Sequence, residues 1–273
     1  MICLLADLRR RWLPDCYPSY VMSWSWLILI LAAWLPTGCT RFSPPDIQLD
    51  MAAEGMVGGL RQTNTGLTRF KCIGKMSMSG PNRSPQSFRV AMAGQFSDRL
   101  RIDMFAPFGG SAGTVSSDGK YIFLVSLPSR EYYKKHLGNG SLRRIIQIDI
   151  TVGDLLEMLV GRIPVHAGLF ARLVPDGDVT RTNLILIDRW GKTRQQITLD
   201  ASRHPVRSVW FDSVQNPVYT LTLSGEQAID GYVLPKRIDL STASGDRVTV
   251  ALERYEVNAR LDEDLFVIAP PPS

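Results

Sequence analysis

From Thr68 onward the sequence adopts a period of two, and this pattern constrains the fold more than any other feature. Apolar and polar residues alternate over three successive stretches separated by short turn-forming segments. Successive side chains of a β-strand point to opposite faces, so each stretch predicts a strand with one apolar and one polar face. Three such strands in a row predict an antiparallel meander. Their apolar positions are Phe70, Cys72, Gly74, Met76 and Met78 in the first, Phe88, Val90 and Met92 in the second, and Leu100, Ile102 and Met104 in the third.

The rest of the chain continues this rhythm, with few helical segments. About eleven antiparallel strands predict a mainly β fold, a half-open antiparallel β-barrel with the helices as a lid over its open side. Helices are predicted over 46–61, with Asp46 as the cap, and over 151–160, capped by Thr151, whereas 142–150 fits either helix or strand. Further strands are predicted near Val115 and over 120–126, 130–134, 184–188, 194–199, 206–212, 218–223, 232–240 and 247–257, and the tail from Leu265 is predicted to close the sheet.

The N-terminal region has the features of a signal peptide. Its apolar run, from Trp24 to Cys39, is shorter than the roughly 20 residues that a membrane-spanning helix needs. Three arginines, Arg9–Arg11, precede the run and supply the positive segment of a secretory signal. The start site is open between Met1 and Met22, and the arginines favour an upstream start.

Removal of the predicted signal, 1–38, leaves a predicted tether, 39–45, and one predicted domain, 46–273. The removed segment carries three arginines and two aspartates, so the mature chain keeps four of the five net positive charges. This mild excess suits anionic lipid headgroups and is too weak to indicate nucleic acid. Only Cys39 and Cys72 remain after cleavage. If Cys39 is acylated, no internal disulfide is available.

The sequence shows no catalytic or metal-binding constellation, so we expect no enzymatic activity, no metal and no cofactor. The His-Glu-x-x-His and P-loop motifs are missing, and the Gly-x-Ser-x-Gly spacing occurs only in the Gly-rich loop at 109–113, which leads into a predicted strand. The histidines His136, His166 and His204 are scattered among predicted loops and read as surface residues. Asp154 and Glu157 lie one helical turn apart, which suits the N-terminal end of a helix before it suits an acid–base pair. Basic residues at 134–136 and 143–144 fit a solvated surface or, alternatively, contact with lipid headgroups.

Methionines stand out on the predicted inner face. Methionine is flexible and polarizable, and it suits surfaces that must fit variable apolar partners such as acyl chains. The alternative is a packed core in which methionine fills gaps, and the pattern favours neither. The predicted lining of an acyl cavity is Phe70, Met76, Met78, Phe88, Val90, Met92, Leu100, Ile102, Met104, Leu155 and Leu159.

The segment Leu35-Pro36-Thr37-Gly38-Cys39 resembles the bacterial lipobox. That resemblance implies cleavage before Cys39, which would then carry a thioether-linked diacylglycerol and an N-acyl chain. The leucine stands one position further from the cysteine than in a typical lipobox. The alternative is an ordinary secretory signal or an uncleaved anchor, with Cys39 a bystander.

The order of the later elements resembles the LolB-type lipoprotein receptors of the bacterial outer membrane and related lipoproteins with a LolA/LolB-like fold. The likeness rests on a lipobox, a helix and a meander, followed by Ala106-Pro107-Phe108-Gly109 and by a helix that ends in Leu159-Val-Gly161-Arg-Ile-Pro164. It is best over Leu60–Val165. It implies a lipid-binding domain whose hydrophobic cavity accepts acyl chains of lipoproteins delivered by a periplasmic carrier.

The family also places an exposed apolar side chain in a loop of Asn-Pro-Leu-Gly type, which passes cargo into the membrane. Phe108 matches that position, between Pro107 and Gly109, although Phe replaces Leu and Ala106 replaces Asn. The alternative is that Phe108 folds back into the core. Thr40 resembles outer-membrane sorting, which implies a lipid anchor at the periplasmic face of the outer membrane. We therefore expect a lipoprotein that binds acyl chains of lipoproteins or other lipids. The alternative is a structural or assembly lipoprotein that binds a protein partner without transferring cargo.

Overall fold

The computed structural model describes residues 50–107, 109–126, 131–138, 140–178 and 180–270. The predicted signal, the predicted tether with Cys39, and Phe108 lie outside these residues. The described part belongs to one compact unit that begins after Ser43. No helix within it is long and apolar enough to cross a membrane.

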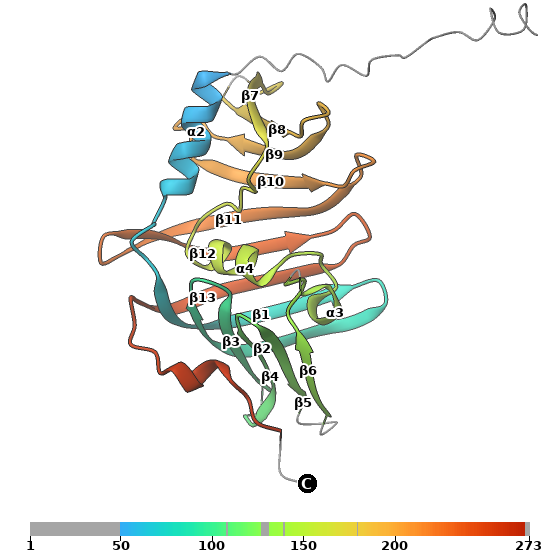
Figure 1. Ribbon diagram of the computed structural model, residues 1–273, viewed down its shortest axis with the longest axis vertical. Coiled ribbons are helices and arrows are strands. Elements are labelled where there is room, and N and C mark those ends of the chain that lie inside the picture. Colours follow the sequence, from blue (N-terminus) through green and yellow to red (C-terminus); the bar gives the residue numbers. More distant parts are fainter. Residues whose placement is uncertain (1–49, 108, 127–130, 139, 179, 271–273) are drawn as a thin grey trace, which may run out of the picture. The chain divides into compact units, whose positions relative to one another are not determined.

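A single antiparallel sheet of thirteen strands makes up most of the described chain (Figure 1). The sheet does not close, and its strand order is β6-β5-β4-β3-β2-β1-β13-β12-β11-β10-β9-β8-β7. The first six strands are β1 (Arg69–Gly80), β2 (Arg83–Gln95), β3 (Arg99–Phe105), β4 (Ser111–Asp118), β5 (Tyr121–Ser126) and β6 (Glu131–His136). The others are β7 (Phe170–Pro175), β8 (Thr182–Ile187), β9 (Thr193–Leu199), β10 (Pro205–Phe211), β11 (Pro217–Ile229), β12 (Tyr232–Ser241) and β13 (Arg247–Val257).

The strand order shows how the chain builds the sheet from its centre. It leaves the centre at β1, proceeds strand by strand to the edge at β6, and crosses the sheet by way of two helices. It re-enters at the opposite edge with β7 and returns until β13 pairs with β1. The pairing of β1 with β13 is therefore the seam that joins the two meanders.

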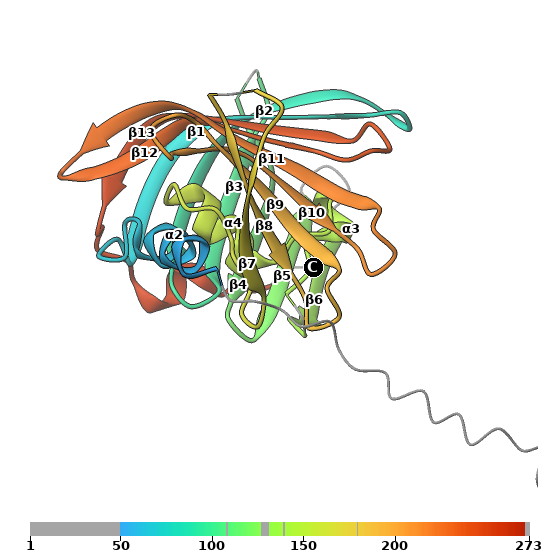
Figure 2. The same ribbon diagram turned by 90° about the horizontal axis from the view of Figure 1, so that it is seen from above.

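Helices occupy the hollow side of the curved sheet. Figure 2 shows the sheet arching over α2, α4 and α3. The helical elements are α2 (Met51–Gln62), α3 (Arg143–Ile146), α4 (Val152–Leu159) and the 3-10 turn η1 (Glu263–Phe266). The α4 helix contacts β3 and β12, on the two sides of the seam. It thus closes the hollow side, as the expected lid does.

The predicted alternation places the apolar side chains inside. Gly94 lets α4 approach the sheet, because a Cβ there would lie 2.5 Å from the Phe70 ring and 2.6 Å from Leu156. Burial of this apolar face is the main stabilising term. Buried inner residues of the first half include Phe70, Cys72, Met76, Val90, Met92, Leu100, Ile102 and Val115, and those of the second half include Leu184, Leu186, Ile197, Leu221, Leu234, Ile238, Leu240, Val248, Val250 and Leu252.

Helix α2 protects the edge strand β7. An edge strand exposes backbone N–H groups that are open to pairing with other chains. Here the Asp50 carboxylate accepts the N–H of Leu173 at 3.0 Å, and Glu54 accepts that of Ala171 at 2.9 Å. Asp50 also caps α2, accepting the N–H of Ala53 at 3.0 Å. At the other edge, β6 exposes lysines, which discourage such pairing by charge.

Several predictions of local structure need correction. The cap of α2 is Asp50 rather than Asp46, because Asp50 is the carboxylate next to the first helical N–H groups. The tail from Leu265 does not close the sheet as a strand but packs on its outer face as η1, where Arg101 and Ser116 bind its carbonyls. The ambiguous 142–150 segment forms only the short α3. Strand β7 was not predicted, and the sheet has thirteen strands where about eleven were expected.

Candidate functional site

A cavity of about 270 Å³ lies on the hollow side of the sheet, between β1–β5 and the helices α3 and α4. Its walls are mostly apolar, and exposed residues Gln86 and Arg144 at its margin show that it reaches the surface. The lining residues are Met76, Met78, Gln86, Phe88, Leu100, Ile102, Met104, Ala112, Gly113, Val115, Leu124, Val125, Ser126, Leu142, Arg144, Ile145, Ile146 and Leu155. This is the position in which the sequence predicts an acyl cavity.

The structure divides the predicted lining into two sets. Seven of the predicted residues line the cavity: Met76, Met78, Phe88, Leu100, Ile102, Met104 and Leu155. The other four, Phe70, Val90, Met92 and Leu159, are buried in the packed core and do not line it. The sequence left open whether these residues line a cavity or form a packed core. The first set lines a cavity, and the second set is packed in the core. The binding of acyl chains by the first set stays a prediction.

The predicted transfer loop lies beside this cavity. Its two stems contribute Met104 and Ala112 to the cavity lining. The loop closes through backbone hydrogen bonds between Ala106 and Gly110 and between Gly109 and Ala106, each 3.0 Å. Pro107 and Gly109 are exposed, and Gly109 has a φ of 84°, which only glycine adopts without strain. Phe108 itself lies outside the described residues, so its role remains a prediction.

The helix beneath the cavity is held by local sequence signals. Thr151 accepts the N–H of Asp154 at 3.0 Å, and Asp154 accepts that of Thr151 at 2.9 Å, which completes the predicted cap of α4. Asp154 also contacts Nε2 of His166 at 3.0 Å. The His166 ring packs against Trp210, with 4.5 Å between ring centroids. These contacts connect α4 to β10.

Electrostatics at this cap predict a pH effect. Burial raises the pKa of Asp154, but hydrogen bonds from His166 and Thr151 outweigh it and hold this pKa below the usual range. A lowered carboxylate pKa stabilises the fold above the unfolded-state value, about 3.9, and this stability is lost as pH falls through the folded-state pKa. We expect Asp154→Asn to lower the free energy of unfolding by about 1 kcal/mol at neutral pH. The difference should shrink in acid, as measured by urea denaturation at pH values on both sides of the lowered pKa. A difference that stays constant into acid would contradict it.

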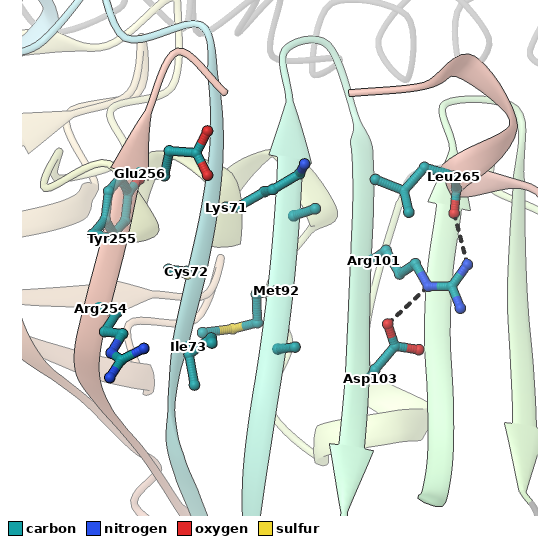
Figure 3. A pocket seen from close by; sticks show the side chains of 12 residues that line it. Lys71, Cys72, Ile73, Met92, Arg101, Asp103, Arg254, Tyr255, Glu256 and Leu265 are labelled. Atoms are coloured by element: carbon teal, nitrogen blue, oxygen red, sulfur yellow. Dashed lines mark hydrogen bonds and ion pairs between the residues drawn. The ribbon is translucent and has the colours of Figure 1, made fainter. Parts of the chain in front are cut away.

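A second hollow, of about 490 Å³, lies on the outer face of the sheet (Figure 3). Outer positions of such a sheet are usually polar, but here Ile73, Ala91 and Ala93 line the hollow. Arg101 donates to Asp103 at 2.9 Å and to the carbonyl of Leu265 at 2.9 Å, as the dashed lines in Figure 3 show. This groove depends on η1, which the sequence did not place there.

The lone cysteine of the described chain lies in the core. Cys72 is free and buried, and burial raises its pKa well above that of an ordinary thiol. Cys72 contributes to the core. It appears beside the outer groove in Figure 3 because it lies on strand β1, which borders that groove.

The predicted surface histidines have different surroundings. All three are exposed, as predicted: His136 ends β6, His204 lies in a turn, and His166 also pairs with Asp154. Among the described residues, no hydroxyl or thiol forms a hydrogen bond with His166 that would complete a nucleophilic triad. The described part of the chain also contains no group of three or more potential metal-ligating side chains. The absence of enzymatic activity stays an expectation.

The fold is similar to those of solved LolA-like proteins. The chain is 13% identical to a LolA superfamily protein from Nitrosomonas europaea, with a TM-score of 0.55, and the match covers 79% of this chain and 97% of that one. A domain described as an outer membrane lipoprotein-sorting protein, from Vibrio parahaemolyticus, is 14% identical with a TM-score of 0.57, covering 78% and 97%. A DUF1329 family protein from Desulfovibrio piger is 13% identical with a TM-score of 0.59, covering 79% and 96%.

At these identities the likeness shows the fold alone. No family model matches the sequence, and no curated protein matches it. The expected LolA-like fold is therefore confirmed, whereas the specific likeness to a LolB-type receptor stays a prediction from sequence.

Proposed function

We propose that this protein is a lipoprotein that binds an acyl chain of a lipoprotein or another lipid in its concave cavity. The observation that carries the proposal is the apolar cavity between β1–β5 and α3–α4, which reaches the surface at Gln86 and Arg144. A lipid anchor at Cys39 and a periplasmic position at the outer membrane complete the proposal, supported by the lipobox-like sequence. The fold it shares with a lipoprotein-sorting domain supports the same class of ligand.

Binding would rest on burial of apolar surface. Each square ångström of apolar surface removed from water contributes about 25 cal/mol. A cavity that exists before binding also avoids part of the ordering cost. Three methionines, Met76, Met78 and Met104, line the cavity and can adjust to chains of different shape.

The size of the cavity limits what it holds. Its 270 Å³ lies just below the range of about 300–1,000 Å³ that is usual for small-molecule sites. The cavity in this form therefore takes part of one acyl chain, and several chains would need α3 or α4 to move. A cargo with one accessible chain is the best match to this geometry.

Met104→Trp tests the proposal, because the larger side chain fills the cavity from β3. We expect this variant to bind a dansyl-labelled fatty acid and a palmitoylated peptide at least about tenfold more weakly, a loss of 1.4 kcal/mol or more. The measurement is a fluorescence titration of the full chain. Ala112→Trp fills the same cavity from β4, and it replaces Met104→Trp if that variant unfolds.

Two matched tryptophan variants serve as controls. Met51→Trp changes a methionine that is 85% exposed on α2, and it should bind normally. Ala91→Trp fills the outer groove of Figure 3 and should also bind normally. Normal binding by folded Met104→Trp, or loss of binding only in Ala91→Trp, would place the ligand elsewhere and overturn the proposal.

A second candidate function is that of an assembly lipoprotein that keeps the fold without transferring cargo. The packing of four predicted lining residues into the core favours it, because it leaves a smaller cavity than the sequence suggests. Mass spectrometry of the purified protein separates the two. Co-purified fatty acid or lipopeptide supports cargo binding, and its absence together with failed titrations supports assembly.

A further inference from the structure

Two neighbouring hairpin turns share one construction. The β8–β9 turn, Asp188–Lys192, and the β10–β11 turn, Asp212–Asn216, are each closed by hydrogen bonds between their first and last residues. In each, the fourth residue has a positive φ, 76° at Gly191 and 71° at Gln215. This backbone is that of a tight hairpin turn with a left-handed fourth position.

The carboxylates of these turns point inward. Asp188 accepts the N–H groups of Trp190 and Lys192, at 2.9 and 3.1 Å. Asp212 accepts those of Val214 and Asn216, at 2.9 and 2.8 Å. These bonds hold the pKa of Asp212 below its usual range, so its carboxylate stays ionised and accepts hydrogen bonds from the backbone of its own turn. The other side chains of each turn therefore form its outer surface.

Apolar side chains occupy the third position, at the tip of each turn. The residue there is Trp190 in one turn, 49% exposed, and Val214 in the other, 69% exposed. The turn itself does not require them. Asp200–His204 is built in the same way at the opposite end of the strands, with Asp200 accepting the N–H of His204 at 2.8 Å, and it carries Ser202 at the tip. The geometry of the turn therefore does not account for the apolar tips.

Two hydrogen bonds join the two turns. Lys192 donates from Nζ to the carbonyl of Ser213 at 2.9 Å, and Gln215 donates from its side chain to the carbonyl of Thr193 at 2.9 Å. Figure 1 shows both turns at the same side of the sheet, at the right of that view. The guanidinium of Arg189 lies 5.0 Å from the centroid of the Trp190 ring. A half-exposed tryptophan, a valine and two cations thus stand together on these two turns.

We propose that this hairpin platform, Asp188–Lys192 with Asp212–Asn216, inserts into the headgroup layer of a membrane that contains anionic lipid. Tryptophan prefers the interface between headgroups and acyl chains, where its ring is buried and its N–H remains solvated. Arg189 and Lys192 supply positive charge for lipid phosphates. Asp188 and Asp212 are turned into the hairpins by their backbone hydrogen bonds. The platform orients the sheet on the membrane independently of the concave cavity.

The test places one tryptophan reporter on each of three turns of the full chain. Trp190 is the first reporter, and its signal is the difference between the parent and Trp190→Phe. Val214→Trp and Ser202→Trp, each in the Trp190→Phe background, report on the second tip and on the matched turn at the opposite end. Vesicles of phosphatidylethanolamine and phosphatidylglycerol with brominated acyl chains quench any tryptophan that reaches the acyl boundary.

Trp190 and the Val214→Trp reporter should be quenched and shifted to shorter wavelength, and the Ser202→Trp reporter should be unaffected. This local readout is needed because the N-terminal apolar run of the full chain can itself attach to vesicles. Equal quenching of all three reporters, or none at Trp190, would overturn the proposal. A blue shift of Trp190 fluorescence that appears only when another protein is added, and not with vesicles, would also overturn the proposal. That result would indicate a protein partner. The dansyl fatty-acid titration of the same variants reports separately on the cavity.

Discussion

Replacing Gly74 with valine is expected to lower the free energy of unfolding by about 3 kcal/mol, or to prevent folding. Gly74 lies in β1 beside the irregularity in its pairing with β13. A Cβ at this position would collide with the backbone carbonyl of Ala251 and would lie 3.3 Å from the Cα of Leu252. A backbone obstacle cannot rotate away, so the seam between the two meanders must open.

The measurement is chemical denaturation followed by circular dichroism. Gly177→Val is the matched control, because a Cβ at Gly177 meets nothing within 4 Å. The control should change stability by less than about 0.5 kcal/mol, as surface substitutions usually do. Comparable losses in the two variants would show that the seam is not the cause.

Arg162→Met is expected to lower stability by about 2 kcal/mol and to weaken acyl-chain binding. The guanidinium is largely buried, 3.2 Å from a carboxylate oxygen of Glu157 and 3.4 Å from the carbonyl of Asn64, and it lies 4.7 Å from the centroid of the Phe96 ring. Removing one partner of a buried ion pair leaves the other charged and unpaired, which costs about 3–5 kcal/mol in full burial and less here, where Glu157 is partly exposed. Because these contacts hold the end of α4, loosening them should disturb the cavity above it.

The electrostatic surroundings of Glu157 support this role. Burial raises the pKa of Glu157, while Arg162 opposes that rise. A raised carboxylate pKa destabilises the fold above the unfolded-state value, so Arg162→Met should lose more stability at neutral pH than in acid. The double variant Arg162→Met/Glu157→Leu should recover most of the loss, because an apolar pair can replace a buried ion pair. A double variant no more stable than Arg162→Met would contradict this account.

Local pattern was sufficient to predict most strands. Alternation over Phe70–Met104 identified β1, β2 and β3 with the correct inner face, because each strand packs one side against the core. The α4 cap at Thr151 could also be predicted, since a capping box forms its hydrogen bonds within four residues. Strand β7 was missed because its pattern is weak: only Ala171 of its six residues is buried, and α2 supplies the partners for its outer edge.

The candidate site needed the tertiary structure. Sequence placed eleven apolar residues on inner faces, but it contains no measure of the space between the sheet and the helices. Folding determines that Phe70 and Leu159 are packed while Met78 and Met104 face open volume. The hairpin platform also needed the tertiary structure, because the turns of Trp190 and Val214 become neighbours only through the pairing of β9 with β10.

The sequence by itself determined the two-faced strands and the cap of α4, since each of these depends on neighbours within a few positions. The tertiary structure alone decided the seam between β1 and β13, the position of η1 on the outer face and the extent of the cavity. The seam and the position of η1 depend on contacts between residues more than a hundred positions apart, such as that of Ser116 with Phe266. The cavity brings together residues from Met76 to Leu155. Periodicity in a sequence specifies which face of a strand is buried. It does not specify how closely the helices pack against that face.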